Sequence, residues 1–279
     1  MITAETYFSV ENNMAYMGTS QFKTFLECEA RGLAEAKGEY QREMTTALLV
    51  GSYVDAHFGK TLAIFKAQHP ELFTQKGELK ADFKHAETII ARIERDPLFM
   101  LMVSGDQQTI KTGEIAGVPF KIKIDSYLSA ELCKEIVNRF PKFVSLMFAD
   151  NALVDLKIMK DFKAVWCKEE QSYISFIRQW QYDLQAAVYQ YIEGHNLPFF
   201  IAAATKEKKE PNIEIFEIPQ EEMDRQLLRV EELAPHFAAI KRGEIEPTRC
   251  EHCDYCKSTK VLTEPKDYRF YDVVVEEEY

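Results

Sequence analysis

The feature that most constrains the fold is an apolar run at residues 153–157 that carries a carboxylate and an ammonium, Asp155 and Lys157, two positions apart. In a β-strand, side chains two positions apart share a face, so these two would project together while the apolar side chains pack behind them. Desolvating two opposite charges usually costs more than their attraction returns. The pair therefore favours a site where a metal ion or a phosphate lies against it. An edge strand with both side chains in solvent is the simpler alternative.

A second candidate strand also carries an acidic residue on its polar side. Strands are predicted at residues 109–115 and 118–128, joined in a hairpin at Gly117. In the second strand, the apolar residues Phe120, Ile122 and Ile124 alternate with Lys121, Lys123 and Asp125. If this strand neighbours that of Asp155, the two carboxylates converge and offer the hard oxygen ligands that Mg²⁺ takes, with waters and a substrate phosphate completing its shell. Lys157 beside them would orient or deprotonate an attacking water, or neutralise charge on phosphorus, which suits phosphodiester hydrolysis.

The remaining pattern predicts a sheet covered by helices. Apolar spacings of three and four residues predict helices, and short β-rich runs predict two further strands. The helices are predicted at residues 19–37, 44–67, 80–95, 174–193 and 220–241, and the strands at 199–204 and 213–218. Residues 129–150 are expected to be partly helical and to separate the two acidic strands. Together these elements predict an α/β or α+β fold.

Taken in order, the acidic residues resemble a known motif. Asp125 followed by Asp155-Leu156-Lys157 resembles the D…(D/E)-x-K signature of the PD-(D/E)XK nuclease superfamily, and residues 154–157 are similar to the I-V-D-L-K-T segment of its RecB-like and RecE-like exonucleases. Those enzymes also carry a Q-x-x-x-Y motif on the helix after the catalytic strand, which Gln185-Ala-Ala-Val-Tyr189 matches. The resemblance extends from about residue 20 to residue 262.

The resemblance implies an architecture for the whole chain. The implied fold is α/β, with a restriction-endonuclease-like (PD-(D/E)XK) core and a central mixed β-sheet flanked by helices. The chain is then a single nuclease domain, residues 1–279, with an N-terminal helical part at 1–105, the catalytic sheet and helices at 106–242, and a C-terminal metal-cluster segment and tail at 243–279.

Individual residues receive roles from the same resemblance. It implies metal binding by Asp125, Asp155 and the backbone carbonyl of Leu156, catalysis by Lys157, and support of the site and the DNA by Gln185 and Tyr189. Because Gln185 and Tyr189 are four residues apart, they lie on one side of a helix. A core tyrosine beside a surface amide is the structural alternative for this pair.

The chain departs from the family's pattern in three respects. The family's helix places a histidine near the metal, four residues after a glycine, and counting from Gly51 that position is Asp55. Asp55 can ligate Mg²⁺ through oxygen, whereas His57, two residues further on, should face elsewhere on a helix. Position 158 is Ile where the relatives usually carry Thr. The thirty residues that separate the two strand carboxylates imply an inserted helix.

Three closely spaced cysteines near the C-terminus predict a second metal site. Cys250, Cys253 and Cys256 supply three thiolates within seven residues. In a reducing compartment, cysteines at this spacing are typical of metal ligands rather than of disulfides. A tetrahedral site needs a fourth ligand.

The fourth ligand follows from the resemblance. His252 lies inside the loop and is poorly placed, and Cys133 and Cys167 are expected to be buried apolar thiols. Several nucleases of the superfamily hold a [4Fe-4S] cluster with one cysteine before the nuclease core and three after it, and Cys28 stands where the single one should. The cluster would join the first helix to the C-terminal segment. Zinc is the alternative, because four cysteines suit either.

Composition limits the partners. A net charge of −11 argues mildly against broad non-specific binding of nucleic acid but is compatible with a local basic groove. Candidate contacts with a polyanion are Lys121, Lys123, Lys134, Arg139, Lys160, Lys163, Lys168, Lys206, Lys208 and Lys209. The start of the chain has no basic region followed by an apolar run, and no stretch is long enough to span a membrane, so a cytoplasmic protein is expected.

These observations predict a Mg²⁺- or Mn²⁺-dependent exodeoxyribonuclease resembling the RecE-like (exodeoxyribonuclease VIII-like) enzymes of phages and prophages, acting on linear duplex ends in recombination or repair. A homo-oligomer or a recombination partner protein is possible. The first alternative is a nucleic-acid-binding protein that kept the fold but lost cleavage, to which the change at Asp55 and the acidic charge give weight. The second is a metal-stabilised scaffold, which leaves Asp155 and Lys157 without a purpose.

Overall fold

The structure is a computed structural model that describes residues 2–168, 170–194, 196–265 and 267–271. Part of the predicted C-terminal segment, residues 266 and 272–279, lies outside the described residues. Along the part of the chain that the structure covers, no helix is both long and apolar enough to cross a membrane.

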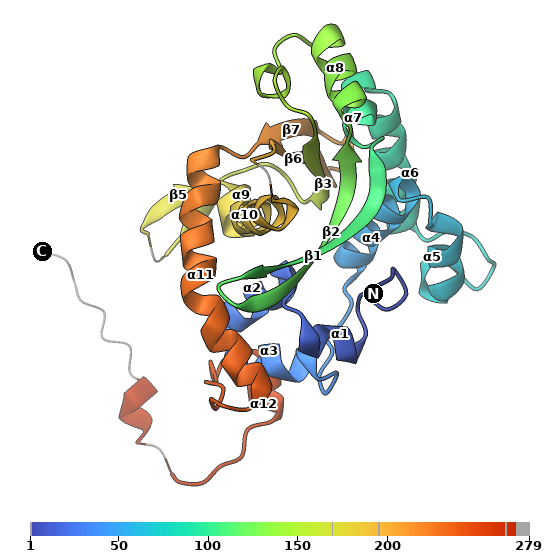
Figure 1. Cartoon of the computed structure of the whole chain (residues 1–279). Coiled ribbons are helices and arrows are strands. Elements are labelled where there is room, and N and C mark those ends of the chain that lie inside the picture. Colours follow the sequence, from blue (N-terminus) through green and yellow to red (C-terminus); the bar gives the residue numbers. More distant parts are fainter. Residues whose placement is uncertain (1, 169, 195, 266, 272–279) are drawn as a thin grey trace, which may run out of the picture.

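A mixed five-stranded sheet forms the centre of the molecule (Figure 1), in the order β1-β2-β3-β6-β7. Its strands are β1 (Asp106–Ile115), β2 (Val118–Leu128), β3 (Ala152–Met159), β6 (Phe199–Thr205) and β7 (Ile213–Glu217). Neighbouring strands are antiparallel except β3 and β6, which are parallel. A separate two-stranded ribbon consists of β4 (Val165–Cys167) and β5 (Ser172–Ile174). The strands of Asp125 and Asp155 are therefore neighbours.

Helices cover both faces of the sheet. The helices are α1 (Val10–Ala15), α2 (Thr19–Glu27), α3 (Glu29–Ala36), α4 (Thr46–Phe58), α5 (Leu62–Gln68), α6 (Ala81–Glu94), α7 (Pro97–Met102), α8 (Ala130–Arg139), α9 (Phe176–Gln179), α10 (Tyr182–Glu193), α11 (Gln220–Arg242) and α12 (Asp254–Ser258). Single 3₁₀ turns lie at Pro70–Leu72, Val144–Leu146 and Tyr268–Tyr271. Helix α8 is the inserted helix that the long spacing between the acidic strands implied.

Alternation along the strands divides the core into two halves. Leu153 of β3 packs with residues of α2, α10 and α11, whereas its neighbours Val154 and Leu156 pack on the other face with residues of α4, α6 and α7. Asp155 and Lys157 therefore share the face of α10, with the apolar side chains behind them, as the sequence predicted. Neither is an edge residue, because β3 lies in the middle of the sheet.

Three predicted long helices are interrupted. The one at residues 19–37 is broken at Cys28, whose extended backbone (φ −166°) ends α2 and begins α3. The one at 44–67 divides into α4 and α5 after Gly59. The one at 174–193 is broken at Gln181, which adopts the left-handed conformation (φ 52°) between α9 and α10. In each case the apolar spacing continued across the break, so the pattern gave no sign of it.

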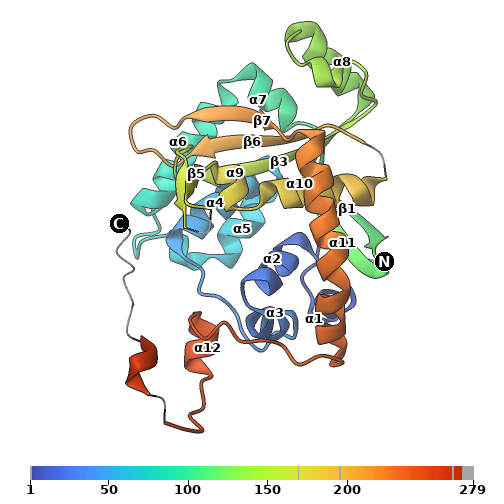
Figure 2. The ribbon, with the colours of Figure 1, turned by 90° about the vertical axis from the view of Figure 1, so that its left-hand side faces the viewer.

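The N-terminal helices and the C-terminal segment lie together below the sheet. Figure 2 shows α11 descending from the sheet past α2 and α3, with α12 returning beside α3. Gly243 ends α11 in a left-handed conformation (φ 77°) that turns the chain back toward α3. Residues 28 and 250–256, far apart in sequence, become neighbours by this return.

Candidate active site

The site begins where β2 and β3 stop pairing. The last paired residues are Ser126 and Val154, and beyond them the strands diverge. Across the gap, the backbone N–H of Leu156 donates a hydrogen bond to Asp125 Oδ2 at 3.0 Å. Because the N–H and C=O of a strand residue point to the same side, the carbonyl of Leu156 also faces the gap. Two carboxylates and a backbone oxygen therefore converge where the sheet opens.

Asp155 is held by two partners although only 2% of its surface is exposed. Gln185 Nε2 donates to Asp155 Oδ1 at 2.6 Å, and Lys157 Nζ forms an ion pair with Oδ2. Burial alone would lower the pKa of Lys157, but the negative charges of Asp155 and Asp125 raise it above its usual value. The ammonium and carboxylate thus stabilise each other in their charged forms.

Helix α10 holds the two diverging strands in place. Gln185 contacts Asp155 of β3, and one turn later Tyr189 Oη donates to the backbone carbonyl of Lys123 in β2 at 3.0 Å. Both side chains are buried, and the Tyr189 ring also packs edge-on against Phe199. Tyr189 is thus a core tyrosine that also hydrogen-bonds the acidic strand. Gln185 is not the surface amide of the alternative interpretation.

A third carboxylate reaches the same place from α4. Asp55 lines a cavity of about 480 Å³ together with Asp125, Asp155 and Lys157. One turn earlier, Gly51 borders this cavity, and a Cβ there would meet no atom within 4 Å, so the absence of a side chain keeps the space open. His57 faces away and contacts Glu94 of α6, with 2.9 Å between Nε2 and Oε1.

The charges of the cavity are poorly compensated. Burial raises the pKa of Asp125 well above its usual value, and the nearby charges of Asp155 and Asp55 raise it further. Burial also raises the pKa of Asp55, against the opposing effect of Lys123 and Lys157. Three carboxylates thus lie close together around one cavity, and the lysines that border it do not offset the rise in the pKa values of Asp55 and Asp125. This electrostatic pattern is typical of a site completed by a cation.

Two residues at the site were not predicted from the sequence, Lys23, which borders the cavity, and Gln108, which contacts Asp125. Lys23 of α2 places its Nζ 5.1 Å from the centre of the Tyr182 ring, and Lys157 Nζ lies 5.2 Å from the same centre. Burial lowers the pKa of Lys23 to about 7, with Lys157 contributing. Gln108 Nε2 donates to Asp125 Oδ1 at 3.3 Å from a left-handed residue of β1 (φ 53°). Neither residue carried a signal in the sequence that pointed to this site.

Some of the suggested polyanion contacts are structural lysines. Lys121 is buried, with Nζ bonded to the Tyr7 carbonyl and, at 2.8 Å, to Asn13 Oδ1. Lys206 Nζ caps the carbonyl of Ala47 at 3.1 Å. Lys121 and Lys123 both border the cavity, but only Lys121 has its ammonium held by these two partners.

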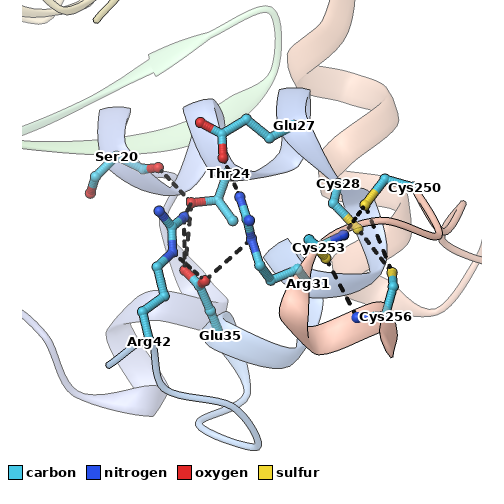
Figure 3. Close-up of polar contacts among 10 residues, drawn as sticks. All are labelled: Ser20, Thr24, Glu27, Cys28, Arg31, Glu35, Arg42, Cys250, Cys253 and Cys256. Carbon is cyan, nitrogen blue, oxygen red and sulfur yellow. Dashed lines mark hydrogen bonds and ion pairs between the residues drawn. The ribbon is translucent and has the colours of Figure 1, made fainter. Parts of the chain in front are cut away.

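The four predicted cysteines meet at a separate site (Figure 3). Their sulfur atoms all lie within 4.8 Å of one another, with Cys28 3.6 Å and Cys250 3.9 Å from Cys256. Cys253 caps α12, and its sulfur accepts a hydrogen bond from the backbone N–H of Cys256 at 3.5 Å. This set can bind a metal ion. Cys133 is buried elsewhere, in the core beside α8.

Comparisons with known proteins agree with this geometry. The model of a family described as a PDDEXK-like domain of unknown function (DUF3799) matches residues 18–134 and 142–259. A crystal structure from Eubacterium rectale, assigned as an exonuclease, is 42% identical, covers 99% of each chain and superimposes with a TM-score of 0.86. A second solved structure, SSO0001, is 12% identical over 84% of this chain and 93% of its own, and its TM-score of 0.30 is too low to carry an argument. No curated protein matches the chain.

Proposed function

The chain belongs to the PDDEXK-like domain family and so to the PD-(D/E)XK nucleases, and from this premise we propose that it is a divalent-metal-dependent DNA exonuclease. The observation that carries the proposal is the convergence of Asp125, Asp155 and Lys157 where β2 and β3 diverge. The 42%-identical protein assigned as an exonuclease supports action at DNA ends. From the motif resemblance we also propose that its substrate is a linear duplex end and that it acts in phage-type recombination or repair in the cytoplasm. It would act as a homo-oligomer or with a recombination partner protein.

The donor set fits a hard divalent cation such as Mg²⁺ or Mn²⁺. Asp55, Asp125, Asp155 and the carbonyl of Leu156 would hold it, since all are oxygen ligands around one cavity. When bound, the ion would polarise a phosphate oxygen and lower the pKa of a water. The raised pKa values of Asp55 and Asp125 are relieved by such a charge.

The protein's own groups would position the substrate and stabilise charge. The Lys157 ammonium, oriented by Asp155, would donate to a phosphate oxygen and neutralise charge that develops as the phosphodiester breaks. Gln185 would keep Asp155 in one rotamer, and Tyr189 would fix the backbone of β2 at Lys123. These two are positioning residues, because each acts through a strand.

The wild-type protein is expected to degrade linear DNA only when Mg²⁺ or Mn²⁺ is present. The test incubates it with an end-labelled linear duplex and with the same sequence as a closed circle, with and without the ion, and follows nucleotide release. An exonuclease releases nucleotides from the linear DNA and leaves the circle intact. Tight DNA binding with no degradation under any condition would instead support the alternative, a DNA-binding protein that has lost cleavage.

Asp55 is expected to replace the family's histidine as a metal ligand, so Asp55→Asn should lower activity at least about 100-fold at limiting Mg²⁺, with partial recovery at high Mg²⁺. His57→Asn is the matched control, because His57 lies two residues away and contacts Glu94 instead. Nucleotide release measured across a Mg²⁺ titration checks both variants. Equal losses in the two variants, or a loss in Asp55→Asn that no Mg²⁺ concentration alters, would contradict the role of Asp55.

We infer that the four cysteines hold a single tetrahedral ion, with zinc the best fit. Zinc–sulfur bonds of about 2.3 Å place the sulfurs of a tetrahedron about 3.8 Å apart. The sulfur of Cys256 lies 3.6 Å from that of Cys28 and 3.9 Å from that of Cys250, close to that spacing. In a [4Fe-4S] cluster the thiolates bind four separate irons and stand further apart. The role would be structural, since Cys28 lies in the N-terminal helices and its partners follow α11.

A further inference from the structure

A second cavity, of about 450 Å³, adjoins the candidate active site. The two cavities share six bordering residues, among them Lys23 and Tyr182. Because Lys157 and Lys23 each lie over the Tyr182 ring, the two lysines mark a continuous path from the acidic site into the second cavity. The second cavity extends away from the carboxylates and has no role in the chemistry described so far.

Two exposed aromatic side chains border this second cavity. Trp180 is 56% exposed and Phe8 is 67% exposed, and both border this cavity although they are far apart in the sequence. The backbone that presents Trp180 is fixed, because Lys23 Nζ donates to the Trp180 carbonyl at 2.9 Å and the next residue, Gln181, is left-handed. Phe8 is held by Lys123, whose Nζ lies 5.3 Å from the ring centre. Both rings are therefore held in place by neighbouring contacts and remain largely exposed to solvent.

The acidic residues on the opposite wall are already neutralised (Figure 3). Glu35 accepts from Arg42 Nε at 2.7 Å and lies 3.5 Å from Arg31 Nε, and Arg31 also pairs with Glu27. Among the described residues, Lys23 forms no ion pair with a carboxylate. Lys23 Nζ therefore lies at the junction of the cavities without a carboxylate ion pair, and a neighbouring phosphate would stabilise its charged form and so raise its lowered pKa.

We propose that this second cavity binds an unpaired nucleotide of the DNA strand being cut, with its base stacked on Trp180 and its phosphate beside Lys23. Every base offers a flat face that stacks on an exposed aromatic ring, which makes such binding insensitive to sequence. A base that is still paired and stacked within a duplex does not present that face. The preferred substrate is then an end with at least one unpaired nucleotide. This inference rests on the proposed function, because it takes the strand being cut to pass through the candidate active site.

The test measures binding rather than cleavage. The Lys157→Ala protein, used as the common background so that DNA stays intact, is titrated with three fluorescent duplexes in Mg²⁺: one blunt, one with a short single-stranded overhang and one whose overhang is abasic. The overhang with bases should bind about 5- to 150-fold more tightly than the abasic one, the range that stacking of one base provides. Adding Trp180→Ala should remove this difference and leave abasic binding nearly unchanged.

Two variants serve as controls. Trp180→Phe should retain most of the difference, and Tyr173→Ala, which removes a 71% exposed ring on β5 that borders neither cavity, should retain all of it. The chain has two tryptophans, so Trp166→Phe leaves Trp180 as the sole one, and its fluorescence should be quenched by the overhang with bases and not by the abasic duplex.

Equal affinity of the background protein for the base-containing and abasic overhangs, or no fluorescence change, would overturn the proposal. So would a Trp180→Ala variant that weakens all three duplexes equally. The outcome is separate from that of the cleavage assay: base-dependent binding without any nuclease activity would refute the proposed function alone, and cleavage without base-dependent binding would refute this inference alone.

Discussion

Replacing Lys157 with alanine is expected to reduce metal-dependent DNA degradation by about 100- to 1,000-fold, the usual effect of removing one charged donor from a transition state. Lys157 is the ammonium paired with Asp155, and it faces a cavity that also contains Asp125 and Asp55. Without it, an incoming phosphate meets three carboxylates with less positive charge to offset them. The change therefore acts on the reaction and on substrate approach together.

The measurement is the initial rate of nucleotide release from linear DNA at saturating Mg²⁺, with thermal unfolding of each protein recorded alongside. Lys142→Ala is the matched control, because it removes an exposed lysine that borders neither cavity and is not among the candidate contacts with a polyanion. Lys142→Ala should retain nearly full activity. A Lys157→Ala protein that is folded and as active as wild type would remove Lys157 from the proposed mechanism.

The central strand could be predicted from sequence because its signal is local. Charged residues set into an apolar run imply a buried polar face, and alternation gave the correct face for Asp155 and Lys157. The hairpin of β1 and β2 and the inserted helix α8 followed from turn chemistry and spacing in the same way. The restriction-endonuclease-like fold that the motif resemblance implied is confirmed.

The rest of the site depends on contacts that no local pattern records. Lys23 reaches the site only after α2 packs against the sheet, and Gln108 only after β1 pairs with β2, and no motif in the sequence around either residue marks it. The sequence predicted one helix at residues 174–193, but the left-handed Gln181 separates α9 from α10 and the Trp180 ring beside it is exposed. Tertiary packing decided both outcomes.

Cys28 is the residue on which the lower half of the molecule most depends. It is the single metal-site cysteine outside residues 250–256, and it lies at the break between α2 and α3. Other polar contacts at this junction include hydrogen bonds and an ion pair: the Ala30 N–H donates to the Thr248 carbonyl at 3.0 Å, and Glu29 accepts from the Thr248 N–H at 2.8 Å and from Thr248 Oγ1 at 2.6 Å and pairs with His236 at 2.7 Å. A structural ion bound by four thiolates contributes more to folding than these partly exposed contacts.

Cys28→Ser is therefore expected to lower the free energy of unfolding by at least about 3 kcal/mol, a fall of roughly 6 °C or more in the melting temperature. Elemental analysis should find one zinc per wild-type chain, purified without oxygen and colourless, and much less in the variant. Cys167→Ser is the matched control, since this half-exposed thiol of β4 lies outside the cluster, and it should keep both the zinc and most of the stability. A wild-type protein that is brown and contains iron would show that the cysteines hold an iron–sulfur cluster instead of zinc. A wild type that is metal-free yet as stable as the metal-loaded protein would refute the structural role, because α11 and the core around Phe22 would then suffice to hold the N-terminal helices in place.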